Sequence, residues 1–122
     1  MFFAKSTIII LSCSIFGIVL AFTMTQKKDI IDYLERNKAL FYKQFSVVKI
    51  GVFGSYARDE QTDNSDIDII IDMPKGTENI FEKRMKLKET ISNHFSMPVD
   101  VCHERAIKPF FRDLILKDVI YV

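Results

Sequence analysis

Residues 54–68 of the chain read GSYARDEQTDNSDID and lead directly into an apolar run at residues 69–71. A Gly-Ser pair opens the stretch, ten residues follow, and Asp66 and Asp68 close it around a single isoleucine. Unpaired charge is costly to bury, so two carboxylates at the mouth of a hydrophobic strand need a physical reason. That reason decides both the fold and the function.

The sequence around this stretch alternates between helical and strand patterns. Apolar spacing predicts helices over residues 28–45, 79–95 and 108–119, and β-rich runs predict strands over 47–53, 66–72 and 98–102. Gly54 and Ser55 form a tight turn after the first strand, and residues 59–65 form a polar loop. The sequence therefore predicts a small α/β unit.

The carboxylates can be placed on this unit. Side chains alternate across a strand, so Asp66 and Asp68 project from one face. Asp100 is a lone acid between two valines of the third strand, and we expect all three carboxylates to converge if that strand lies beside the second. Their repulsion would be relieved by a cation. Oxygen ligands suit Mg²⁺, with Mn²⁺ as a substitute, and such clusters hold two ions in nucleotidyl displacement.

The Gly-Ser turn supplies a complementary, phosphate-binding group. Gly54 allows a sharp turn and a close approach to a ligand, while the Ser55 hydroxyl and the amides of a short helix that follows are suited to phosphate oxygens. Arg58 lies one helical turn further on and is expected to reach the same phosphates, although an exposed charge with nothing bound is an equal alternative. We therefore predict a triphosphate at the turn, opposite the metal ions.

Composition limits the classes of protein. The 122 residues are 48% hydrophobic, which is enough for one small domain with a core. After residue 26 the chain carries 16 basic and 16 acidic side chains. A neutral domain lacks the basic surface that provides non-specific nucleic-acid affinity, so no principal nucleic-acid partner is expected. Cys13 and Cys102 indicate no disulfide framework or zinc site.

The first 26 residues form a separate apolar segment. Residues 6–25 contain no charged side chain, a length that suits a membrane-spanning helix. As an anchor, with Lys27 and Lys28 after it, the segment would leave the domain on the cytoplasmic side. Alternatively Met24 is the natural start of a cytoplasmic protein. A signal peptide is disfavoured by its poor cleavage site. Both favoured interpretations leave residues 27–122 as the domain.

These motifs resemble the DNA polymerase β-type nucleotidyltransferase superfamily, in which a Gly-Ser pair precedes an Asp-x-Asp pair. GSYARDEQTDNSDIDIII is similar to the minimal nucleotidyltransferase branch, the MNT or MntA-like antitoxins, from about residue 28 to residue 122. The resemblance implies the polymerase β-type nucleotidyltransferase fold, a small mixed sheet flanked by helices. One departure is Asp59, where family members commonly carry Gly.

The resemblance also implies roles for residues. Gly54 and Ser55 are expected at the nucleotide phosphates, Asp66 and Asp68 as metal ligands, and Asp100 as the third carboxylate, which helps to activate the nucleophile. Members of this branch typically pair with a helical HEPN-type toxin ribonuclease, and characterised ones transfer AMP from ATP to a toxin tyrosine. The expected function is therefore that of an antitoxin and protein adenylyltransferase, with ATP and a cognate HEPN-type toxin as its partners.

Two other functions stay open. The domain is either a non-catalytic antitoxin that neutralises its partner by steric binding, or a nucleotidyltransferase that modifies small molecules such as aminoglycosides. The short domain is expected to lack the extra helical domain with which antibiotic-modifying enzymes hold small substrates, which favours a protein acceptor. Finally, an apolar cluster near the C-terminus, at Phe110, Phe111, Leu114 and Ile115, is predicted to be core, and any part left exposed would suit a partner helix.

Overall fold

The computed structural model describes residues 25–122, so the segment at residues 1–24 lies outside it. Within the described residues no helix is long and apolar enough to span a membrane. The elements run in the order α3 (Lys27–Phe45), β1 (Lys49–Phe53), α4 (Gly54–Ala57), β2 (Ile67–Asp72), α5 (Ile80–Phe95), β3 (Val99–His103), a 3₁₀ turn η1 (Glu104–Ala106), α6 (Pro109–Leu116) and β4 (Ile120–Tyr121).

The strands form one mixed sheet in the order β3-β2-β1-β4. β2 and β3 are parallel, with Asp68 opposite Asp100, while β1 runs antiparallel to both β2 and β4. A parallel pair requires a crossover connection, and helix α5 provides it. The predicted small mixed sheet flanked by helices is therefore confirmed. The sequence did not predict β4, because two residues are too few to show the alternating pattern of a strand.

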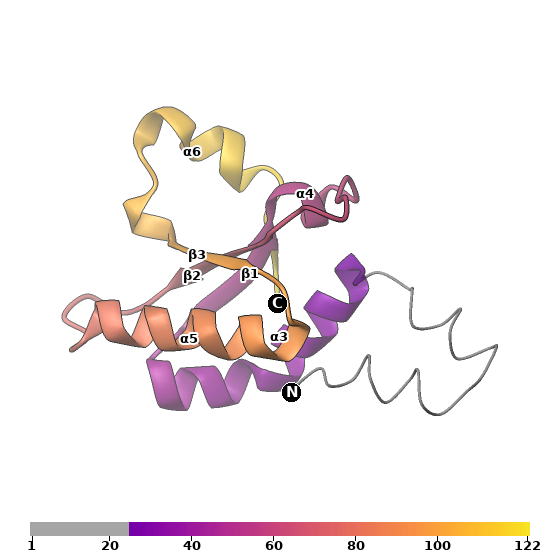
Figure 1. Ribbon diagram of the computed structural model, residues 1–122. Helices are drawn as coiled ribbons and strands as arrows, with labels where there is room; N and C mark the ends of the chain where they lie inside the picture. Colours follow the sequence, from indigo (N-terminus) through magenta and orange to yellow (C-terminus); the bar gives the residue numbers. More distant parts are fainter. Residues whose placement is uncertain (1–24) are drawn as a thin grey trace, which may run out of the picture.

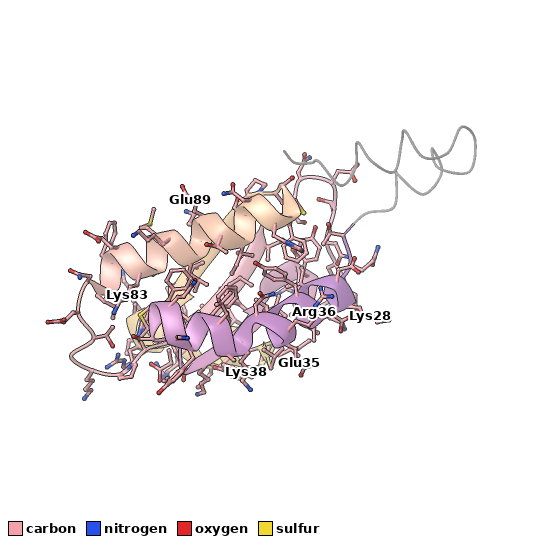
Figure 2. The ribbon with its side chains drawn as sticks, turned by 90° about the horizontal axis from the view of Figure 1, so that it is seen from below. Lys28, Glu35, Arg36, Lys38, Lys83 and Glu89 are labelled. Atoms are coloured by element: carbon pink, nitrogen blue, oxygen red, sulfur yellow. The ribbon has the colours of Figure 1, made fainter. Side chains whose placement is uncertain are left out.

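Helices α3 and α5 cover one face of the sheet (Figure 1). Their apolar stripes pack on alternate residues of the strands, and Tyr33 of α3 stacks edge-on against Phe95 of α5 with 5.1 Å between ring centroids. The outer sides of both helices carry charged side chains, including Lys28, Arg36 and Glu89 (Figure 2). This layer is the core that the helical periodicity predicted.

The opposite face of the sheet carries the acidic residues. Here the chain places α4, η1 and α6, with α6 standing away from the sheet (Figure 1). Glu104 of η1 holds this side together, because its carboxylate accepts hydrogen bonds from Lys49 Nζ at 3.1 Å and from Tyr121 Oη at 3.0 Å. Helix α6 buries none of its residues. The prediction that Phe110, Phe111, Leu114 and Ile115 form core is therefore wrong.

Candidate functional site

Two neighbouring strands bring the main carboxylates together. Asp68 and Asp100 are register partners on parallel β2 and β3, and side chains at paired positions of parallel strands project from the same face. That face lies opposite the α3 and α5 layer. Asp66 comes just before β2, which begins at Ile67 rather than at residue 66. It is exposed, as is Asp100, whereas Asp68 is partly buried.

The Gly54 turn meets this pair directly. β1 is antiparallel to β2, with Phe53 opposite Asp68, and Gly54 begins helix α4 with a φ of 73°. A Cβ atom added to Gly54 would overlap Oδ2 of Asp68. Only glycine combines this left-handed backbone with so close an approach of the main chain to a carboxylate. Residue 54 therefore both turns the chain and leaves room for the acidic group.

Local hydrogen bonds shape the loop between the turn and Asp66. The amide of Glu60 donates to the carbonyl of Ser55 at 2.8 Å, and the amide of Thr62 donates to Oγ of Ser65 at 2.8 Å. Serine side chains that accept from nearby amides are typical turn formers. The loop thus returns the chain to β2 with Asp66 at its mouth. Ser55 lies in the first turn of α4 and is partly exposed.

The negative charges of Asp100 and Asp66 both act on Asp68. The pKa of Asp68 is raised to about 6, first by burial and then by these two carboxylates, while Arg58 acts in the opposite direction. A carboxylate that is half-desolvated and next to two like charges holds its proton more tightly. The site therefore carries excess negative charge at neutral pH, which a bound cation would relieve.

Arg58 is held by acidic neighbours. Its Nε donates to Oε1 of Glu60 at 2.9 Å, and its Nη1 donates to Oδ2 of Asp118 at 3.4 Å. The ion pairs are exposed, and such pairs contribute little to stability. Arg58 is thus an exposed side chain paired with two carboxylates, and its expected contact with nucleotide phosphates stays a prediction.

A pocket of about 400 Å³ adjoins the turn. Phe53, Gly54 and Arg58 form one side, and the C-terminal end of α6 forms the other with Leu114, Ile115, Lys117 and Asp118. The sequence analysis assigned none of these α6 residues to the site. They carry no motif, and only the return of the chain along β4 brings them beside Gly54.

The fit of a metal ion rests on the donor set. Among residues 25–122 no group of three Asp, Glu, His or Cys side chains is positioned to hold a metal ion. The donors are nevertheless all carboxylates, and burial together with the negative charges of Asp100 and Asp66 raises the pKa of Asp68. Such donors suit Mg²⁺. The residues therefore fit a magnesium ion by the chemistry of their donor atoms.

The structure explains the departure at position 59. Asp59 has a φ of 57°, in the left-handed region that favours glycine. Aspartate tolerates this region better than most residues, and its carboxylate accepts a hydrogen bond from Lys27 Nζ of α3 at 2.8 Å. The substitution thus keeps the path of the loop and adds a link to the helix.

We expect Asp59→Gly to change the free energy of unfolding by less than about 1 kcal/mol, because relief of backbone strain offsets the loss of an exposed ion pair. Asp59→Ala loses the ion pair but keeps the strain, and is expected to be less stable than Asp59→Gly. Urea denaturation of both variants measures the difference. Equal stabilities would contradict a left-handed backbone at this position.

The Asp68 pKa predicts a pH dependence. The pKa of Asp68 in the folded protein is about 6, against 3.8 for an unperturbed aspartate. Below pH 4 this group contributes its full stability, which is lost as the pH rises through about 6. In EDTA, the Tm of Asp68→Asn minus that of wild type should therefore be larger at pH 7 than at pH 4. The same difference in Tm at both pH values would contradict this prediction.

Comparison with known proteins identifies the family of this chain. The nucleotidyltransferase domain family matches residues 29–122. A Methanocaldococcus jannaschii protein, MJ0128, named as a candidate protein adenylyltransferase, is 36% identical over 77% of this chain and 95% of its own length. The protein adenylyltransferase MntA of Thermococcus cleftensis is 30% identical over 81% of this chain and 98% of its own length.

Solved structures agree on the fold. A candidate minimal nucleotidyltransferase superposes with a TM-score of 0.66 at 25% identity, covering 79% of this chain and 95% of that one. A variant of the toxin-antitoxin complex MntA-HpeT superposes with a TM-score of 0.54 at 21% identity, covering 80% and 71%. Family match, identity over nearly whole relatives and fold all point the same way: this chain belongs to the nucleotidyltransferase domain family.

Proposed function

We propose that this chain is a metal-dependent protein adenylyltransferase that transfers AMP from ATP to a tyrosine of a cognate HEPN-type toxin, and so acts as an antitoxin. The observation that carries the proposal is the placement of Asp68 beside Asp100 on neighbouring strands, with Asp68 in contact range of Gly54. Two relatives carry the name of protein adenylyltransferases, one of them MntA. The resemblance of the Gly-Ser and Asp-x-Asp motif to MntA-like antitoxins favours a toxin as the acceptor.

The geometry suggests a division of labour. The Gly54 backbone and the Ser55 hydroxyl bind phosphate oxygens of ATP, and Arg58 exchanges Glu60 and Asp118 for the same phosphates. Asp66, Asp68 and Asp100 would hold magnesium, which when bound neutralises charge on the attacking and leaving oxygens.

The transfer itself is a displacement at the α-phosphate. The tyrosine oxygen attacks in line, a bond from that oxygen to the α-phosphorus forms, and the bond from the α-phosphorus to the bridging oxygen breaks, which releases pyrophosphate. Asp100 is exposed at the edge of the cluster and accepts the phenolic proton as the bond forms.

Labelled ATP tests the proposal. The protein is incubated with Mg²⁺, with ATP labelled at the α-phosphate and with the cognate HEPN-type protein, and we expect label on a tyrosine of that protein. Label that persists in the Asp66→Ala/Asp68→Ala variant, or that is absent from the wild-type reaction, would contradict transfer by this site. If the Asp66→Ala/Asp68→Ala variant transfers no label but still neutralises the toxin, steric binding is favoured. Label on an aminoglycoside would favour a small-molecule acceptor.

A further inference from the structure

The outer side of α6 presents an apolar surface to solvent. Phe110 is 87% exposed, Phe111 47% and Leu114 61%, and no residue of the helix is buried. These three side chains are called the α6 ridge below. Phe110 and Leu114 are four residues apart and therefore adjacent on one helix face, and the rings of Phe110 and Phe111 lie 5.1 Å apart. Contiguous exposed apolar side chains of this kind mark interaction sites.

The position of the ridge distinguishes it from other exposed apolar residues. Phe81 is 63% exposed and belongs to α5, which lies on the opposite face of the sheet from α6 (Figure 1). Leu114, by contrast, lines the pocket that also includes Gly54 and Arg58. The ion pair between Arg58 and Asp118 ties the end of α6 to the same turn. The ridge is therefore continuous with the candidate active site.

Charge indicates what the ridge would bind. Lys117 follows Leu114 by three residues on the same face, and Lys108 caps the N-terminus of α6. Both are exposed, and no ion pair joins either lysine to another residue of the described range 25–122. Asp113 is the only acidic residue inside α6. A complementary surface is therefore apolar and carries carboxylates beside its apolar stripe.

We propose that the α6 ridge docks an amphipathic, acid-flanked helix of the acceptor protein and so delivers the acceptor tyrosine to the cleft at Gly54 and Asp68. The proposal rests on the proposed function, because it assigns a surface to the acceptor of that reaction. A helix laid along Phe110 and Leu114 buries its apolar stripe on the ridge and sets its carboxylates near Lys117. A side chain at its end then lies beside the pocket that Leu114 shares with Arg58.

Direct binding provides the first test. All proteins carry Asp66→Asn, so that ATP is not turned over, and calorimetry measures the dissociation constant for the cognate HEPN-type protein. We expect Phe110→Asp to raise this constant by at least about tenfold. Phe110→Leu should restore most of the affinity. Phe81→Asp is the matched control, because it adds the same charge at an exposed phenylalanine away from the ridge, and its affinity should equal that of the parent.

Kinetics provide the second test. With catalytic residues intact, Phe110→Asp should raise the KM for the HEPN-type protein by at least about tenfold, leaving the KM for ATP and the saturated kcat close to wild type. Because Phe110 is 87% exposed, the Tm of the variant should match that of Phe81→Asp. A matching Tm excludes a folding defect as the cause.

The outcomes separate the two proposals. Equal affinities of Phe110→Asp and Phe81→Asp for the toxin, or no binding of the toxin by wild type, overturn the docking surface. The same is true if wild type forms a dimer that Phe110→Asp dissociates, since a second copy then covers the ridge. Binding that depends on Phe110 without any transfer of label overturns the proposed chemistry and leaves the docking surface standing.

Discussion

Replacing Asp68 by Asn is expected to lower the rate of AMP transfer by at least about 10²-fold and, in EDTA at pH 7.5, to raise the Tm. Asp68 is the register partner of Asp100 and lies beside Gly54. The amide keeps the shape of the side chain but removes the charge that would hold a cation. It also removes a carboxylate whose pKa is raised by burial and by repulsion from Asp100 and Asp66, so the loss of activity and the gain of stability have one cause.

Both quantities can be measured on one preparation. Transfer is followed with labelled ATP, and the Tm by calorimetry with and without Mg²⁺. Mg²⁺ should raise the Tm of wild type and leave that of Asp68→Asn unchanged. Asp63→Asn is the matched control, because Asp63 is an exposed aspartate of the loop that precedes β2, and it should resemble wild type in rate and in Tm. A variant Asp68→Asn that remains active would remove Asp68 from the chemistry.

Replacing Gly54 by Ala is expected to destabilise the fold by at least about 2 kcal/mol and to abolish transfer. Two costs add: a left-handed φ of 73° that alanine adopts poorly, and a Cβ atom that overlaps the Asp68 carboxylate. The Asp68 carboxylate must therefore move, which changes its position relative to Asp66 and Asp100. For a domain of this size the loss corresponds to a fall in Tm of about 10 °C.

Gly76 offers a control within the same chain. It has a φ of 82°, but a Cβ atom there meets nothing within 4 Å. Gly76→Ala therefore measures the backbone cost alone, and the excess destabilisation of Gly54→Ala measures the contact with Asp68. Calorimetry measures the stability of both variants, and transfer from labelled ATP measures their activity. If the two substitutions cost the same and Gly54→Ala keeps its activity, the close approach at residue 54 has no role.

Much of the site follows from local rules. Strands β1 to β3, the helices α3 and α5, and the Gly-Ser turn were predicted to within a few residues, because each has a short-range pattern of apolar spacing or turn chemistry. The common face predicted for Asp66 and Asp68 rests on the alternation of side chains in a strand, whereas Asp66 lies just before β2. The predicted approach of Asp100 to the other two aspartates depended on a condition, namely that β3 lies beside β2.

Local sequence patterns did not predict the environment of the C-terminal helix α6. The apolar residues of α6 satisfy a helical pattern, yet the pattern does not state whether the apolar side of a helix is covered. The sheet here is already covered on one face by α3 and α5, and its other face carries carboxylates rather than an apolar surface. Phe110 and Leu114 therefore have no core to enter, and the prediction that they are buried failed.

By itself, the sequence determined helices α3 and α5, strands β1 to β3 and the sharp turn at Gly54, because neighbours within a few residues set all of them. Only the tertiary structure decided that Asp100 lies opposite Asp68, that the end of α6 borders the Gly54 pocket and that the α6 ridge faces solvent. These depend on contacts between segments far apart in the chain, whose partners are selected by the assembled sheet and not by local spacing.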